Sequence, residues 1–172
     1  MIRLIGGLLI TMSLSLLGFQ AARSLDEEYR EMEELRKILI SIKSEMQYGR
    51  SFLAETFLAV SEIQEEPYAG WFRNMYELMS SRKPGTLASI WKNSASAYLK
   101  DLSLREREKR RLYELGRYLG QTDLAGQLRH LDLYAEHLET EMENRRMEMQ
   151  PLKKLYRVLG VTAGIFLTIL LI

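Results

Sequence analysis

The sequence contains no cysteine, only three prolines among 172 residues, and no stretch in which polar and apolar residues alternate as they do in a β-strand. The absence of cysteine excludes disulfides, thiolate zinc sites and cysteine nucleophiles. Scarce proline with plentiful Leu, Glu, Arg, Met and Ala is typical of long helices. A chain of this length has room for one ordinary domain. We therefore expect an all-α protein.

Acidic residues are absent from both ends of the chain. All 23 acidic residues lie between Asp26 and Glu148 with 19 of the 24 basic residues, so this segment has a formal net charge of −4. Uncharged runs flanked by basic residues are the pattern that a bilayer imposes on an anchored protein. We therefore predict three parts, residues 4–23, 24–152 and 153–172. The remaining basic residues are the expected membrane anchors: Arg3, Arg23, Lys153, Lys154 and Arg157.

The first apolar run, Leu4 to Ala22, would measure about 28 Å as a helix, close to the thickness of a bilayer core. The alternative is a cleaved secretory signal, which requires small residues at positions −3 and −1 of the cleavage site. Cleavage after Ala21 or Ala22 would place Phe19 or Gln20 at −3. We therefore expect a retained transmembrane helix over residues 4–23.

The second run, Val158 to Ile172, would measure about 22 Å as a helix. Leu155 and Tyr156 lengthen it, and the basic anchors before it can reach the headgroups. The alternative is a buried core helix, but a run this apolar on every side is hard to cover in a small protein. We expect a second transmembrane helix over residues 153–172.

Basic residues gather on the inner side of both runs, next to the charged segment. Because positively charged flanks stay in the cytoplasm, we expect residues 24–152 to be cytoplasmic and both termini to lie across the membrane.

Apolar residues between the runs recur at helical spacing, three and four residues apart. Helix ends are indicated at Gly49 and at Lys83-Pro84, a cap at Ser51, and a capping box at Ser103 and Glu106. We therefore expect an antiparallel bundle of about six helices.

The first helix, 26–48, carries one apolar seam: Met32, Leu35, Leu39, Ile42 and Met46. The last helix, from about Thr122, carries another: Leu124, Leu128, Leu131, Ala135, Leu138 and Met142. We expect Leu39 and Leu128 to be nearly fully buried. Aromatic residues at helical spacing are expected in the same core: Tyr68, Trp71, Phe72, Tyr76, Trp91 and Tyr98.

No residue pattern supports catalysis or a cofactor. His130 and His137 lie seven residues apart, with Glu141 one turn further. A di-iron bundle would require Glu at the positions of Gln127 and Tyr134. Phosphate loops, nucleophile elbows and zinc-protease motifs are absent from the sequence. We therefore expect no enzyme activity, no metal, no cofactor and no small-molecule substrate.

The most charged stretch is residues 105–111, with the sequence REREKRR. Alternating charges of this kind favour a solvated helix face. A protein-docking face is the second interpretation, and nucleic-acid binding, which the acidic segment around it disfavours, is the third. The docking hypothesis rests on four residues: Arg105, Arg107, Lys109 and Arg110.

Four segments resemble the stage III sporulation protein AB family of endospore-forming bacteria. They are LIGGLLI near the start, SEMQYG at residues 44–49, LGRYLGQTDLAGQL at 115–128 and LKKLYRVLGVTAGIFLTILLI at the end. The last is the most specific, because its lysine pair and LGV tail are shared by family members. The resemblance covers essentially the whole chain.

The resemblance implies a six-helix domain similar to the cytoplasmic domain of the F component of type II secretion and type IV pilus machines. It also implies membership of an eight-protein complex in the mother-cell membrane, facing the forespore and forming a channel. By analogy with the secretion platform, a companion cytoplasmic ATPase would dock on the domain. We therefore expect a membrane-anchored scaffold whose partners are membrane lipid and other proteins of the complex. The alternatives are a helical signalling adaptor and an unrecognised membrane-bound enzyme.

Overall fold

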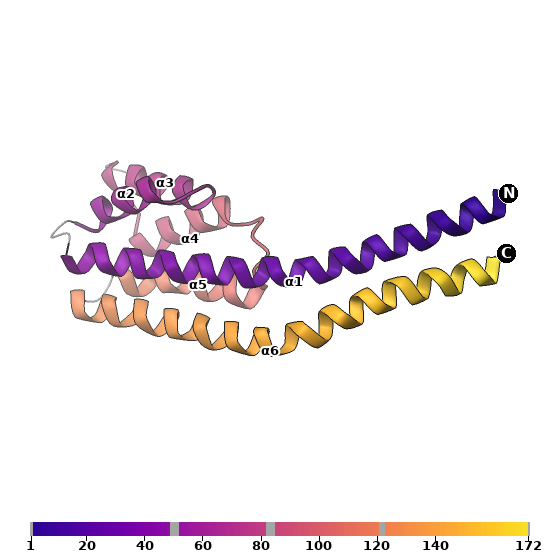
Figure 1. The fold of residues 1–172 in the computed structure, drawn as a ribbon. Coiled ribbons are helices and arrows are strands. Elements are labelled where there is room, and N and C mark those ends of the chain that lie inside the picture. The colour runs from indigo at the N-terminus through magenta and orange to yellow at the C-terminus, as the bar shows by residue number, and fades with distance from the viewer. Residues whose placement is uncertain (1, 49–51, 82–84, 121–122, 172) are drawn as a thin grey trace. The chain divides into compact units, whose positions relative to one another are not determined.

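The computed structural model describes the backbone of residues 2–48, 52–81, 85–120 and 123–171, and the side chains of these ranges apart from residues 2–5, 8 and 171. Within these ranges the chain forms six α-helices and no strand, so the prediction of an all-α fold is confirmed (Figure 1). The expected features at Gly49, Ser51, Lys83-Pro84 and Thr122 lie outside the described residues, as does the side chain of Arg3. The helices are α1 (Ile2–Tyr48), α2 (Leu53–Ile63), α3 (Tyr68–Ser80), α4 (Leu87–Tyr98), α5 (Glu106–Leu119) and α6 (Leu124–Leu171).

The chain divides into two compact units, and the long helices α1 and α6 contribute to both. The bundle unit comprises Glu31–Glu141, and the terminal unit combines Met1–Arg30 with Met142–Ile172. The helix α1 is continuous where the sequence suggested separate membrane and domain helices, and α6 continues through Pro151. Each unit is described by itself.

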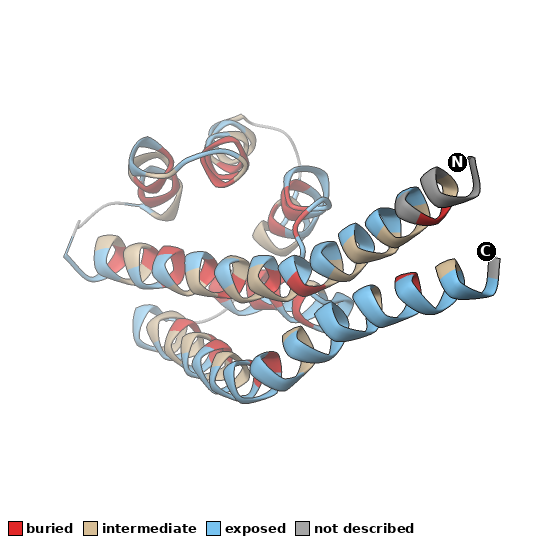
Figure 2. Ribbon diagram, turned by 45° about the vertical axis from the view of Figure 1, so that its right-hand side comes forward, coloured by how far each residue is buried: buried red, intermediate tan, exposed pale blue. Residues whose placement is uncertain are grey.

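The α1 seam predicted from the sequence is confirmed in the bundle unit. All five of its residues are buried, and Leu39 is only 1% exposed. Figure 2 shows buried residues recurring along one side of the helix, turn after turn. A stripe of this kind forms because side chains three and four positions apart share one helix face.

The α6 seam was predicted only in part. Leu131 and Leu138 are buried, but Leu128 is half-buried and Leu124 is 51% exposed. The buried stripe of α6 in the bundle unit runs through Leu131, Tyr134 and Leu138, so Tyr134 takes the place expected for Ala135. The expectation for Leu128 was therefore wrong, because the helix is rotated slightly about its axis and Leu128 lies at the edge of the contact.

Two ion pairs join α1 to α6 within the bundle unit. Arg36 Nη2 lies 2.9 Å from Glu139 Oε2, and Lys43 Nζ lies 2.6 Å from Asp132 Oδ1. Seven residues forward on α1 correspond to seven residues backward on α6, so the two helices run antiparallel here. These pairs are partly exposed, so they specify register more than they stabilise the fold.

Four aromatic side chains from three helices form the centre of the bundle unit. The rings of Phe57 on α2 and Phe72 on α3 are 5.7 Å apart, and those of Trp71 on α3 and Trp91 on α4 are 4.8 Å apart. All four are fully buried, and each such ring removes about 150–250 Å² from water. Of the aromatic residues that the sequence placed in this core, Tyr98 is 39% exposed and Tyr76 is only half-buried.

The close approach of α4 and α5 depends on Gly116. A Cβ atom at this position would lie 2.4 Å from Cγ of the Trp91 indole. The same indole donates a hydrogen bond from Nε1 to the carbonyl oxygen of Leu112, at 2.7 Å. Because the indole occupies the space that a side chain would need, the packing of α4 on α5 requires glycine here.

The fifth helix begins later than the predicted capping box. Ser103 is not its cap: Arg105 occupies the N-cap position without a side-chain hydrogen bond, and Glu106 is the first helical residue. Leu102 and Leu104 are both buried. Alternate residues can both reach the core when the backbone is not helical, and this accounts for the delay of the helix.

In the terminal unit, small residues let α1 and α6 approach closely. Cβ atoms built at Gly18 and Gly164 would lie 2.6 Å from the Tyr156 carbonyl oxygen and 2.8 Å from Thr11 Cα. The hydroxyl oxygens of Thr11 and Thr168 are 2.8 Å apart. Nearer the bundle residues in sequence, the unit contains ion pairs between Glu28 and Arg145 and between Asp26 and Lys153.

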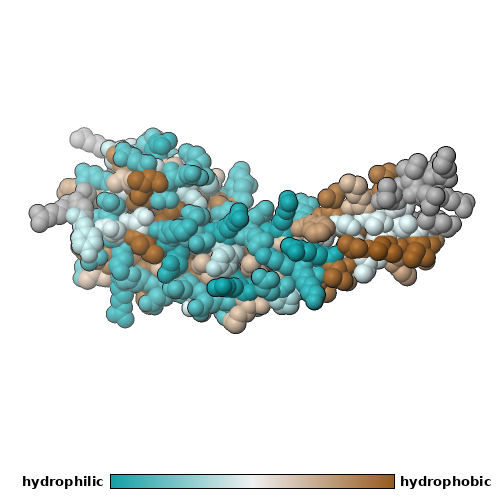
Figure 3. All heavy atoms as spheres, in the orientation of Figure 1, coloured by the Kyte–Doolittle hydropathy of each residue, from teal (hydrophilic) through white to brown (hydrophobic). Residues whose placement is uncertain are grey.

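Large apolar side chains lie exposed on the helices of the terminal unit, where Figure 3 shows hydrophobic surface in brown. Among the residues that the structure describes, no helix is long and apolar enough to cross a membrane. The expectation of two transmembrane helices, 4–23 and 153–172, therefore has no support from the described part of the chain. The most exposed of these side chains include Leu9, Met12, Leu16, Leu17, Phe166, Ile169 and Leu170.

The contrast between Leu39 and Leu128 yields a stability prediction. Leu39→Ala should lower the free energy of unfolding by about 2–5 kcal/mol, because it leaves a cavity in a fully packed region. Leu128→Ala, with the same chemistry at a half-buried site, should cost clearly less. Urea unfolding of the full-length chain, followed by circular dichroism, measures both. Equal losses for the two variants would contradict the burial assigned to α6.

Candidate functional site

The four residues of the predicted docking face do not share one environment. Arg105 is exposed at the N-cap of α5, and Arg110 is exposed with Nε donating to the carbonyl oxygen of Glu106, at 3.3 Å. Lys109 is largely buried, since its side chain is only 13% exposed and Nζ donates to the carbonyl oxygen of Lys100, at 2.8 Å. Alternate residues of a helix point in different directions, so a run of cations is divided among several surfaces.

Arg107 belongs to a polar cluster between α5 and α6. Its Nε donates to Glu108 Oε1 at 3.0 Å, and its Nη2 donates to Glu141 Oε2 at 2.6 Å. Hydrogen bonding to Glu108, followed by the charge of Glu141, raises the pKa of Arg107. This guanidinium bridges two carboxylates that come from different helices.

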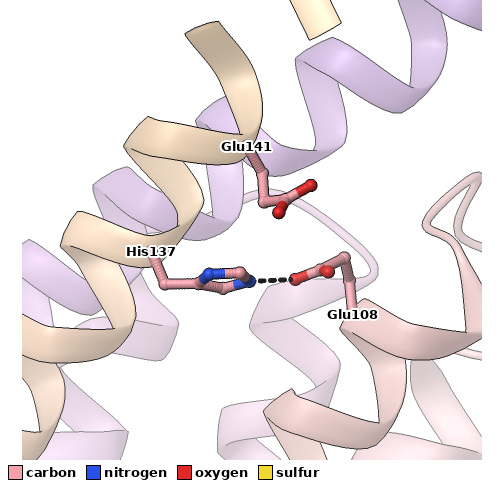
Figure 4. Close-up of side chains that lie close together, drawn as sticks. All are labelled: Glu108, His137 and Glu141. Atoms are coloured by element: carbon pink, nitrogen blue, oxygen red, sulfur yellow. Dashed lines mark hydrogen bonds and ion pairs between the residues drawn. The ribbon is translucent and has the colours of Figure 1, made fainter. Parts of the chain in front are cut away.

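Figure 4 shows Glu108 on α5 pointing toward His137 and Glu141 on α6. Glu108 Oε2 lies 2.9 Å from His137 Nε2, and one potential ligand atom from each of the three residues falls within 4.8 Å of the others. Sequence reasoning singled out His137 and Glu141 but missed Glu108. Nothing in the local sequence marks Glu108, because it comes from another helix.

The donor set of this cluster resembles a metal site, but its charge does not. Glu108 is 2% exposed, and a buried carboxylate requires nearby cations or hydrogen-bond donors. Arg107 provides both, and Arg111 Nη1 lies 2.8 Å from His137 Nε2. Two guanidinium groups at the same place repel a divalent cation. We therefore call this arrangement an ionic clamp between α5 and α6. It comprises Arg107, Glu108 and Arg111 of α5 and His137 and Glu141 of α6.

Tyr134 completes the clamp from the buried side. Its hydroxyl donates to the carbonyl oxygen of Glu108, at 3.3 Å. Burial, followed by the negative charge of Glu108, raises the pKa of Tyr134 well above its ordinary value. The phenol therefore stays neutral wherever the bundle unit is folded under ordinary conditions.

The other histidine is separate from the clamp. The His130 ring stacks on Tyr118, with centroids 4.0 Å apart. Both rings line an open hollow of about 420 Å³ that also reaches Arg111, Tyr134 and His137. The structure therefore brings both histidines to one groove, and within the described part of the chain only His137 contacts a carboxylate.

A second hollow, of about 560 Å³, lies between α4 and α5. Lys92, Arg110 and Arg117 line it, together with the single acidic residue Glu114. Arg110 belongs to the predicted docking face, whereas Lys92 and Arg117 were not singled out in the sequence. The seven-residue spacing of Arg110 and Arg117 was the available signal for one shared helix face.

The raised pKa of Tyr134 predicts an alkaline loss of stability. A tyrosine whose pKa is raised by folding stabilises the folded state fully below its ordinary pKa of 10.0, and this contribution falls as pH rises above that value. Above about pH 10, the unfolding free energy of the native chain should fall more steeply than that of Tyr134→Phe, by up to about 1.4 kcal/mol per pH unit.

Urea unfolding at a series of pH values measures this slope. Tyr48→Phe, at a 75% exposed tyrosine, serves as the matched control and should follow the native chain. Parallel curves for the native chain and Tyr134→Phe would show that Tyr134 titrates normally.

The chain is similar in sequence and in structure to known proteins. A model of the family described as stage III sporulation protein AB matches residues 3–172. A relative named stage III sporulation protein AB from Bacillus subtilis (strain 168) is 26% identical over 171 residues, covering 99% of each chain. A solved structure titled Stage III sporulation protein AB (SpoIIIAB) superposes with a TM-score of 0.63 and 23% identity, over 72% of this chain and 97% of that one. This structural likeness supports the helical fold. Because the family match spans almost the entire sequence, the chain belongs to the stage III sporulation protein AB family.

Proposed function

We propose that this protein is a non-enzymatic scaffold of a sporulation complex, anchored in the mother-cell membrane, whose bundle unit docks a companion cytoplasmic ATPase. The observation that carries the proposal is the family match, which includes both the charged bundle unit and the apolar ends. The family is named for sporulation and not for a reaction, in agreement with a role in assembly.

The membrane anchor is supported by the surface of the terminal unit. Its large outward side chains are apolar, and its two helices contact each other through Gly18, Gly160 and Gly164. Close contacts through small residues are common where helices associate in lipid, since burying apolar side chains against each other gains little there.

The docking of an ATPase rests on analogy with the F component of secretion platforms and on the charged surface of the bundle unit. The hypothesis based on Arg105, Arg107, Lys109 and Arg110 needs refinement, because Arg107 is held by the ionic clamp and Lys109 is largely buried. Arg105 and Arg110 remain on the surface, although Arg105 also makes further contacts.

The structure offers a separate argument against each of the two alternatives, a signalling adaptor and a membrane-bound enzyme. A signalling adaptor would offer its long seams to a partner helix, but in this chain Leu39, Leu131 and Leu138 are already buried within the bundle unit. A membrane-bound enzyme would need a reactive group in one of the two hollows. The polar groups of the clamp instead bond to one another.

A co-purification experiment tests the docking proposal. The full-length protein carrying an affinity tag, isolated from sporulating cells of its own species, should retain the companion ATPase. A tagged membrane protein from outside the complex is the control. Recovery of the other complex components without the ATPase would refute docking and keep the scaffold role.

The membrane topology provides an independent prediction. Because the chain has no native cysteine, only an introduced thiol can be labelled. A cysteine placed after Ile172 should react with an impermeant thiol reagent on intact cells, whereas Lys100→Cys, at an exposed site of the bundle unit, should react only after lysis. The reverse pattern would overturn the proposed orientation, and labelling of neither before lysis would argue against a terminus across the membrane.

A further inference from the structure

The hollow between α4 and α5 gathers positive charge in an otherwise acidic region. Lys92 of α4 and Arg110 and Arg117 of α5 line it, and Glu114 is the only acidic residue in its lining. The segment from Asp26 to Glu148 has a formal net charge of −4, so the excess of cations at this hollow is local. Like charges brought to one concave surface repel one another, and an anionic ligand relieves that repulsion.

These three cations have no carboxylate partner among the described residues, as is also true of Arg73 and Arg129. Arg36, Lys43 and Arg107 each form an ion pair with a carboxylate on another helix. Within the described part of the chain, no ion pair engages Lys92, Arg110 or Arg117: the three are exposed, and Arg110 donates only to a backbone carbonyl. Their charge is therefore available to a ligand.

The walls of the hollow adjoin a fully buried contact between α4 and α5. Lys92 follows Trp91, whose indole lies against Gly116 and donates to the Leu112 carbonyl. Arg117 in turn follows Gly116. Neighbours of a fully buried contact keep their backbone position, so the cations on the two helices are presented at a defined separation.

The spacing of the cations indicates the size of the ligand. Arg110 and Arg117 are seven residues apart on one helix, which corresponds to about 10.5 Å along its axis. Such a row is longer than a single small anion. Successive carboxylates along a polypeptide can follow it, because side chains on one face of an extended chain repeat about every 6.6–6.8 Å.

We propose that this hollow binds an acidic segment of a partner protein, with the segment's carboxylates contacting Lys92, Arg110 and Arg117. Arginine forms two parallel hydrogen bonds to a carboxylate, which adds direction to the attraction. Tyr113, which also lines the hollow, offers ring surface to the methylene groups of Glu side chains. The inference rests on the proposed function in one respect, that the segment belongs to a docked protein.

The probe is a fluorescently labelled hexaglutamate peptide, titrated into the full-length protein and followed by anisotropy. Native protein should bind it with an affinity that falls as salt rises. Arg110→Glu/Arg117→Glu should bind at least about tenfold more weakly. Arg73→Glu/Arg129→Glu makes the same change in net charge at exposed cations outside the hollow and should bind within about twofold of native. Circular dichroism confirms that both variants are folded.

Equal binding by the native protein and Arg110→Glu/Arg117→Glu, or no binding by any version, would overturn the proposal. Inorganic phosphate at the peptide's concentration provides a second arm. Competition by phosphate as strong as that of unlabelled peptide would identify a site for small anions and would also overturn the assigned ligand.

Co-purification with the same variants separates this inference from the proposed function. An ATPase retained by native protein and by Arg110→Glu/Arg117→Glu alike would leave the proposed function standing and refute the hollow as its docking site. An ATPase retained by neither, with peptide binding still lost only in the hollow variant, would refute ATPase docking and support the acidic-segment site.

Discussion

The indole ring of Trp91 connects three elements of the bundle unit. It contacts the aromatic rings of α2 and α3, donates a buried hydrogen bond to the Leu112 carbonyl of α5, and fills the space above Gly116. Any side chain at Gly116 would displace it. The separation of α4 and α5 follows from this one contact, and so does the hollow between them, because Lys92 and Arg117 are the sequence neighbours of the two contacting residues.

On the opposite side of α5 lies a buried carboxylate whose charge is compensated by neighbouring groups. Glu108 is almost fully buried, and its carboxylate is matched by Arg107 and His137 while Tyr134 bonds to its backbone carbonyl. Removing one partner of such a group is costly because the carboxylate would remain buried without compensation. The same seven-residue stretch of α5 thus supplies cations to two purposes. Arg107 secures α5 to α6, whereas Arg110 faces the open hollow against α4.

The terminal unit follows a different packing rule. Its helices meet at glycine and threonine and direct large apolar side chains outward, whereas the bundle unit buries its largest side chains and exposes charge. A protein assembled in this way has one part suited to an apolar environment and another suited to water. The proposed anchored scaffold rests on this contrast, with the charged surface as the part that would be available to partner proteins.

From the amino-acid sequence we could predict the helical class, the seam of α1, most of the aromatic core and the family. These features follow from local spacing: a repeat of three and four residues places side chains on one face whatever the rest of the chain does. Exceptions such as Leu128 and Tyr98 lie at the edges of contacts, where a small rotation of a helix decides burial. Tertiary structure alone decided which charged residues meet. Glu108 joins His137 across 29 positions, and Lys92 joins Arg110 and Arg117 from a separate helix. Pairings of this kind depend on the distance between helices, which Gly116 and Trp91 establish, and helical periodicity does not encode it.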